Sequence, residues 1–187
     1  MKLAVGVYGA AGGRISRQAR ELCYQVGQEI ARQGCLLLTG ACPGLPYEAV
    51  KGCRAVGGLT VGVSPALNLT EHRRRYRSPY EKFDVLIYTG DGLMGREVTA
   101  VRSCDIVIIA GGRSGTLGEF AIAYDEAKTI GILLGTNGIA EHVSMIIEAI
   151  DKETGAIVLE DDSPARLLRR LIRAHRRRPE EKVPTEV

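Results

Sequence analysis

The sequence predicts a single doubly wound α/β domain, in which helices cover both faces of one parallel sheet. Short apolar runs alternate with amphipathic stretches, three of the runs end in glycine-rich turns, and 187 residues suit one domain. Strands that are apolar throughout are typical of parallel sheets, because helices bury both faces. We place the domain at residues 1–175 and expect a polar C-terminal tail over residues 176–187.

The first half of the chain opens with an apolar strand, Leu3–Tyr8, that leads directly into glycines. Apolar residues then recur at helical spacing over Ser16–Gln33, and Gly34 ends this helix as glycine commonly does. The same alternation predicts a second strand at Cys35–Thr39 and a helix at Tyr47–Val56. Two further strands are predicted at Leu59–Val63 and Phe83–Thr89. A charged stretch before the last of these strands predicts a long loop.

The second half continues the alternation. A helix is predicted over Leu93–Ser103. It precedes a strand at Cys104–Ala110, in which every residue after Asp105 is apolar. Two further strands are predicted at Ile130–Leu134 and Ala156–Leu159. Helices are predicted before, between and after them, at Leu117–Lys128, Glu141–Lys152 and Pro164–Ala174. The order gives seven strands separated mainly by helices, as a doubly wound sheet requires.

The composition excludes several classes of protein. Hydrophobic residues make up 45% and charged residues 25%, and no run approaches the roughly 18 apolar residues of a membrane span. A net charge of +3 and 5% aromatic residues do not favour nucleic-acid binding. The five cysteines form no CxxC pair, so we expect reduced thiols, a cytoplasmic location and no metal site.

Glycine-rich turns are the main functional signal. They lie at residues 9–13 (GAAGG), 39–44 (TGACPG) and 111–116 (GGRSGT), each after a strand and before a helix. Glycine lets a backbone approach a ligand closely, and a helix N-terminus offers free N–H groups to an anion. These turns predict a site for a small phosphate-bearing ligand, built by Gly9, Ala10, Gly40, Gly44, Gly112, Arg113, Ser114, Gly115 and Thr116.

Two familiar phosphate-binding classes do not fit these turns. The glycines of the first turn do not form GxGxxG, and the second strand ends in Thr39-Gly40 where an acid for a ribose would be needed. The chain also lacks GxxxxGK[ST]. A dinucleotide site and a P-loop are therefore not predicted.

The third turn belongs to a longer motif. Arg96 precedes Asp105, the strand IVIIA follows, and residues 111–119 read GGRSGTLGE. With these residues the chain resembles the LOG proteins and the molybdenum-cofactor-carrier-like proteins, a Rossmann-like superfamily whose signature is PGGxGTxxE preceded by an arginine and an aspartate. The resemblance extends over roughly residues 3–135 and includes TGACPGLPYEA.

The resemblance implies an activity and roles for two residues. LOG enzymes hydrolyse a nucleoside 5′-monophosphate to free base and ribose 5-phosphate, which makes Arg96 and Glu119 candidate catalytic residues. Cleavage of an N-glycosidic bond builds positive charge on the ribose, so a carboxylate beside C1′ is needed. The resemblance also implies a homodimer or larger homo-oligomer and no required cofactor. Members are often named lysine decarboxylases, but nothing here resembles a pyridoxal-phosphate site.

Departures from the motif keep a second function open. Gly111 replaces the family's proline, Arg113 replaces a glycine, and Glu97 stands where the cytokinin-activating members have lysine. Around Arg96 the match is closer to the carrier-like branch. The alternative to an enzyme is therefore a carrier or sensor that binds a nucleotide or a pterin-phosphate cofactor without turnover.

Several residues have structural alternatives. Thr116 and Glu119 also fit a capping box, which would satisfy helix N-terminal donors without chemistry. Asp105 is expected to be a structural partner of a nearby backbone group or arginine rather than a catalyst, and Met94 either packs in the core or contacts a ligand base. Arg73, Arg74 and Arg75 either close over a phosphate-rich ligand or form surface salt bridges with Glu71 and Glu81.

Overall fold

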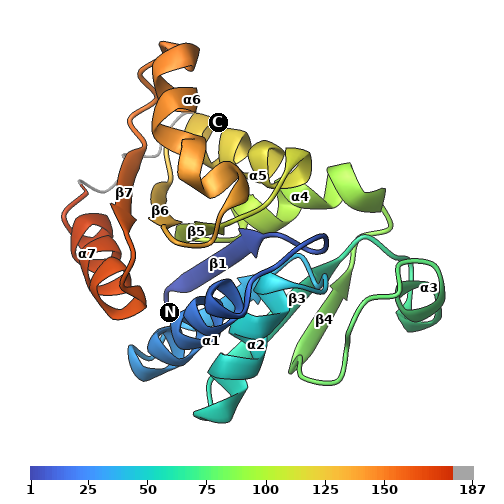
Figure 1. Ribbon diagram of the computed structural model, residues 1–187. Coiled ribbons are helices and arrows are strands. Elements are labelled where there is room, and N and C mark those ends of the chain that lie inside the picture. The colour runs from blue at the N-terminus through green and yellow to red at the C-terminus, as the bar shows by residue number, and fades with distance from the viewer. Residues whose placement is uncertain (179–187) are drawn as a thin grey trace, which may run out of the picture.

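The computed structural model describes residues 1–178 and contains one seven-stranded parallel sheet in the order β4-β3-β2-β1-β5-β6-β7 (Figure 1). The strands are β1 Ala4–Gly9, β2 Leu36–Thr39, β3 Leu59–Ser64, β4 Val85–Tyr88, β5 Ile106–Ala110, β6 Thr129–Leu133 and β7 Ile157–Asp161. The predicted doubly wound, Rossmann-like α/β fold is confirmed. All seven predicted strands form at nearly their predicted positions.

Helices cover both faces of this sheet. They are α1 Arg17–Arg32, α2 Leu45–Ala55, α3 Leu69–Arg74, α4 Gly92–Arg102, α5 Ser114–Asp125, α6 Val143–Ile150 and α7 Pro164–Arg176, with a 3-10 turn η1 at Gly138–His142. α1, α2 and α7 pack on one face over a core that includes Val26, Ile30 and Leu167. α4, α5 and α6 cover the other face around Phe120 and Ile132 (Figure 1).

The chain reverses its direction of travel across the sheet at β1. The strands β2, β3 and β4 extend from one side of β1, and β5, β6 and β7 extend from the other. β1 and β5 pair in register from Val5 with Ile106 to Gly9 with Ala110, so their carboxyl ends lie side by side. In this architecture ligands bind beyond the carboxyl ends of the strands at such a reversal.

The charged stretch between β3 and β4 differs from the prediction, because it contains the helix α3 rather than only a loop. The Asn68 side chain caps α3 by accepting a hydrogen bond from the Glu71 N–H at 3.0 Å. His72 anchors the helix to the sheet: it is fully buried and contacts Ser64 Oγ through Nδ1 at 2.8 Å. Asn68, a residue type that commonly caps helices, was therefore a signal in the sequence for a helix start at Leu69.

The start of α5 and the exposure of β4 also differ from the prediction. α5 begins at Ser114, three residues before the predicted start at Leu117. β4 lies at the edge of the sheet, so Val85 and Ile87 remain about half exposed instead of being buried. The tail expected over residues 176–187 begins with Arg176, the last residue of α7, and its part from residue 179 lies outside the described residues.

Candidate functional site

A cavity of about 460 Å³ opens at the point where the strand order reverses. That volume lies within the range of small-molecule sites. Its walls come from the turns after β1, β2 and β5 and from one face of α4: Gly9, Ala10, Ala11, Cys42, Leu93, Met94, Arg96, Glu97, Arg113, Ser114, Gly115, Thr116 and Glu119. The cavity therefore collects most of the predicted site residues in one place.

The N-terminus of α5 forms one wall. Arg113 is the N-cap residue, and no side chain caps this helix end. The N–H groups of the first turn, from Ser114 to Thr116, are therefore available to an anion, and the helix dipole favours a negative charge there. The Arg113 guanidinium lies against Gly13 in the first glycine-rich turn and adds a positive charge to this wall.

An ion pair lies at the base of the cavity. Arg96 Nη1 is 3.4 Å from Glu119 Oε1, and the two residues are 4% and 6% exposed. Arg96 Nε is buried and has no hydrogen-bond partner in the described part of the chain. Because a buried donor without a partner is costly, the pair is only partly satisfied by the protein and has capacity for a ligand.

Burial changes the ionisation of the groups around this pair. It raises the pKa of Glu119 to about 8, an effect that Arg96 opposes and Glu97 reinforces. It also raises the pKa of the Cys42 thiol to about 12, so this thiol stays protonated at neutral pH and is not a nucleophile. Glu119 therefore has a pKa suited to proton transfer near neutral pH.

The pKa of Glu119 also makes stability depend on pH. Between the ordinary value of 4.5 and about 8, the folded protein keeps a proton that the unfolded chain has lost. Raising the pH through this range therefore favours unfolding. We expect the free energy of unfolding of the wild type to fall, relative to Glu119→Gln, between pH 5 and pH 8, as measured by denaturant titration. Parallel pH curves for the two proteins would show that Glu119 ionises normally.

Three predicted ligand-binding glycines do not line the cavity but shape it. A Cβ on Gly40 would lie 1.8 Å from Arg96 Nη1, so Gly40 leaves the space that the guanidinium occupies. A Cβ on Gly44 would lie 2.1 Å from the Ala10 carbonyl oxygen, where the first two turns pack together. Gly112 has φ +94°, and a Cβ there would meet Thr116 Oγ1 at 2.2 Å.

The departure at Gly111 has a backbone explanation. Gly111 has φ +60°, which the proline ring cannot adopt. Its N–H also donates a hydrogen bond to Thr136 Oγ1 at 2.8 Å, and proline has no N–H to donate. This chain therefore builds its third turn with a conformation that the family's PGG sequence does not permit.

The structure decides three of the open alternatives. The capping-box interpretation of Thr116 and Glu119 is wrong, because α5 begins earlier and Glu119 pairs with Arg96. Asp105 binds a backbone group as expected, accepting a hydrogen bond from the Ala4 N–H at 2.7 Å. Met94 is 70% exposed and lines the cavity, so it is not a core residue.

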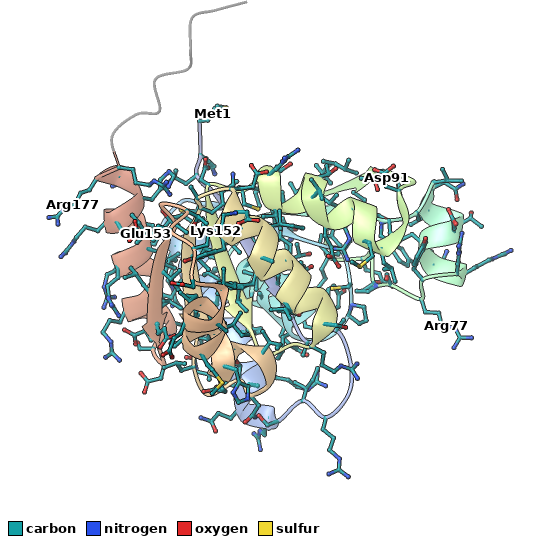
Figure 2. The ribbon with its side chains drawn as sticks, turned by 90° about the horizontal axis from the view of Figure 1, so that it is seen from above. Met1, Arg77, Asp91, Lys152, Glu153 and Arg177 are labelled. Atoms are coloured by element: carbon teal, nitrogen blue, oxygen red, sulfur yellow. The ribbon has the colours of Figure 1, made fainter. Side chains whose placement is uncertain are left out.

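Arg73 and Arg74 are the last residues of α3, Arg75 is its C-cap, and none of the three lines the cavity. Arg75 forms an ion pair with Glu71 at 2.6 Å, and Arg73 packs over the Tyr80 ring. A second group of basic residues lies on and just after α7, at the far end of the molecule from α3, as the opposite positions of Arg77 and Arg177 show (Figure 2). There Arg166 and Arg170 both pair with Asp161.

These contacts predict that the α3 arginines do not close over the ligand. The triple variant Arg73→Gln, Arg74→Gln, Arg75→Gln should change the Kd for a nucleoside monophosphate by less than about twofold at about 0.15 M salt, where charges beyond about 8 Å are screened. Isothermal titration calorimetry measures this directly. A tenfold loss of affinity would instead support the lid.

The sequence predicts no ligand contact for Leu93, and it marks Glu97 only as a departure from the family motif. Both residues face the cavity from α4. Their spacing of four residues places them on one face of a helix, one turn apart. Leu93 lies three residues before the candidate Arg96, so helical spacing was a signal for Leu93, and the spacing of four residues from Leu93 extends that signal to Glu97.

Within residues 1–178 no group of three or more His, Cys, Asp and Glu side chains is arranged to hold a metal ion. None of the helices in this part of the chain is long and apolar enough to cross a bilayer.

The model of the SLOG cluster4 family matches residues 2–168, nearly the whole described chain. The chain belongs to this family. The SLOG cluster4 assignment confirms the resemblance to LOG and molybdenum-cofactor-carrier-like proteins. An uncharacterized protein from Archaeoglobus fulgidus is 34% identical over 134 residues, which cover 71% of this chain and 82% of that protein.

Solved structures share the SLOG fold over almost the full chain. The molybdenum cofactor binding protein from the phototrophic bacterium Rippkaea orientalis is 30% identical, with a TM-score of 0.75 over 93% of this chain and 97% of its own. The Moco carrier protein from Chlamydomonas reinhardtii is 26% identical, with a TM-score of 0.75 over 93% and 99%. The sheet and its helices are thus common to this SLOG protein and to these cofactor-binding proteins.

Proposed function

We propose that the cavity binds a small ligand made of a phosphate and a flat heterocycle, in the class of nucleoside 5′-monophosphates and pterin phosphates. The observation that carries this proposal is the convergence of two features in one cavity of about 460 Å³. The uncapped N-terminus of α5 suits the phosphate, and the partly unsatisfied Arg96–Glu119 pair lies beside it. Exposed apolar side chains of α4 suit the heterocycle.

We further propose that Arg96 and Glu119 hydrolyse the N-glycosidic bond of a bound nucleoside monophosphate. Arg96 would hold the ribose or its phosphate as a fixed cation, while Glu119 lies near C1′. In its ionised form Glu119 would orient the attacking water and stabilise the positive charge that develops on the ribose. As the water oxygen bonds to C1′, Glu119 would take the water proton, the C1′–N bond would break with its electron pair going to the base, and the departing base would take up a proton from solvent. A pKa of about 8 leaves a fraction of Glu119 ionised at neutral pH, as a residue that accepts and returns a proton requires.

The second candidate function is that of a carrier or sensor, which holds its ligand without turnover. It is supported by the fold shared with a molybdenum cofactor binding protein and with a Moco carrier protein. It is also supported by Glu97, whose negative charge replaces the lysine of the cytokinin-activating enzymes. Both functions use the same cavity, so the fold alone does not separate them.

One experiment separates the two. The binding of AMP, GMP, IMP, CMP, UMP and 6-hydroxymethylpterin phosphate to the purified protein is measured by calorimetry, and free base released from the nucleotides is measured by chromatography. Binding with base release supports the hydrolase, and binding without release supports the carrier. If neither the nucleotides nor 6-hydroxymethylpterin phosphate binds, the proposed ligand class is wrong.

A further inference from the structure

Glu97 is a buried carboxylate that the proposed chemistry does not use. It lines the cavity, is only 5% exposed, and neighbours Arg96 on α4. Within residues 1–178, no backbone or side-chain group donates a hydrogen bond to its carboxylate or forms an ion pair with it. Burial accordingly raises the pKa of Glu97, and Arg96 only partly offsets that effect. Because Glu97 lines the cavity, its carboxylate oxygens can instead accept hydrogen bonds from a ligand that brings its own donors.

Two glycines of α5 make room for the Glu97 carboxylate at the wall of the cavity. The carboxylate oxygens lie along a glycine face of α5, where a Cβ on Gly115 would be 3.5 Å from Oε1 and one on Gly118 would be 3.0 Å from Oε2. Leu93 and Met94 lie one turn earlier on α4, line the same cavity and are largely exposed. The α4 wall therefore offers an apolar surface with a carboxylate next to it.

We propose that Glu97 selects a heterocycle with two adjacent N–H donors, the 2-amino-4-oxo-pyrimidine edge that guanine and pterins share. This inference rests on the proposed function, because it specifies the heterocycle bound in the same cavity. The two Glu97 oxygens accept one hydrogen bond each, from the ring N–H and from the 2-amino group. Leu93 and Met94 contact the ring face, while the N-terminus of α5 holds the phosphate.

Other common bases match this carboxylate less well. Adenine offers its amino group beside an unprotonated ring nitrogen, which would face a carboxylate oxygen lone pair to lone pair. Hypoxanthine has the ring N–H but lacks the 2-amino group, so one Glu97 oxygen stays unpaired. Uracil places its single N–H between two carbonyl groups, and cytosine offers one amino group beside an acceptor.

Charge strengthens this selection. An ionised Glu97 beside the first turn of α5 repels a phosphate bound there unless donors on the ligand offset its charge. A ligand that carries both a phosphate and a donor pair satisfies the two walls together. Phosphate alone does not satisfy the Glu97 wall. The heterocycle therefore helps to retain the phosphate, in addition to determining which ligand is selected.

The test compares GMP, IMP, AMP and 6-hydroxymethylpterin phosphate on the full-length wild type and on Glu97→Gln, by isothermal titration calorimetry. Wild type should bind GMP or the pterin phosphate at least about tenfold more tightly than IMP and AMP, as one lost bidentate contact implies. Glu97→Gln should remove that preference, because its amide donates where the carboxylate accepted. A comparison of the Kd values for GMP and for the pterin phosphate shows whether the protein prefers the guanine or the pterin form of this donor pair.

The control is Glu148→Gln, which removes the same charge from an exposed residue of α6 outside the cavity and should leave every Kd unchanged. Equal binding of GMP and IMP to wild type, or a GMP preference that survives in Glu97→Gln, overturns this inference while the proposed ligand class stands. No binding of any of the four ligands overturns both.

Discussion

Glu119→Gln is expected to slow base release from nucleoside 5′-monophosphates by about 10²- to 10⁴-fold, the usual contribution of a positioned acid–base group. Glutamine has almost the same shape but can neither take up the proton of the attacking water nor carry the negative charge that stabilises the ribose. The affinity for substrate should change much less, because the uncapped N-terminus of α5 and the α4 wall remain. Single-turnover assays with chromatographic detection of free base measure the chemical step directly.

Glu148→Gln is again the matched control and should release base at the wild-type rate, since Glu148 is exposed on α6. Equal release by wild type and Glu119→Gln would contradict the role of Glu119 and indicate a contaminating enzyme or another catalytic group. Thermal unfolding of both variants establishes that each is folded before the rates are compared.

Gly40→Ala is expected to impair the site almost as severely, although Gly40 does not line the cavity. The new methyl group would occupy a position 1.8 Å from Arg96 Nη1 and therefore displace the guanidinium from Glu119. Because a displacement of about 1 Å can cost about 100-fold in rate, we expect a loss of that order in turnover, or a comparable weakening of ligand binding in a carrier. Calorimetry and product analysis at one substrate concentration detect either loss.

Gly12→Ala is the control for this substitution. A Cβ on Gly12 meets no atom within 4 Å, and Gly12 belongs to the same set of glycine-rich turns. It should bind and turn over ligand like the wild type. If Gly40→Ala also behaved like the wild type, Arg96 would have to function from a different position, and the ion pair with Glu119 would not be required.

The sequence predicted the fold because its local signals agree with the global topology. Apolar runs such as Cys104–Ala110 carry enough information to place a buried parallel strand. Gly34 marks the end of α1, and its φ of +71° is one that glycine adopts readily. The position of β4 in the sequence was predicted, but its exposure was not, because that exposure depends on the place of β4 at the edge of the sheet. α3 was missed because its apolar content is low and its anchor is a buried histidine, His72.

The candidate site was predicted in part. The three glycine-rich turns correctly indicated the carboxyl ends of the strands, and Arg96 and Glu119 were both identified as candidates. Their direct contact was beyond the sequence, because 23 residues and a strand separate them. The role of Gly40 was also beyond it, since only the packing shows that this glycine makes room for Arg96 rather than approaching a ligand.

A crystal structure of the protein with GMP, or with 6-hydroxymethylpterin phosphate, tests the central claim most directly. The phosphate should accept hydrogen bonds from the backbone N–H groups at the start of α5, between Ser114 and Thr116. The sugar or linker should lie beside Arg96 and Glu119, with the heterocycle against α4. A ligand bound elsewhere on the protein, or one whose phosphate lies away from α5, would contradict the account.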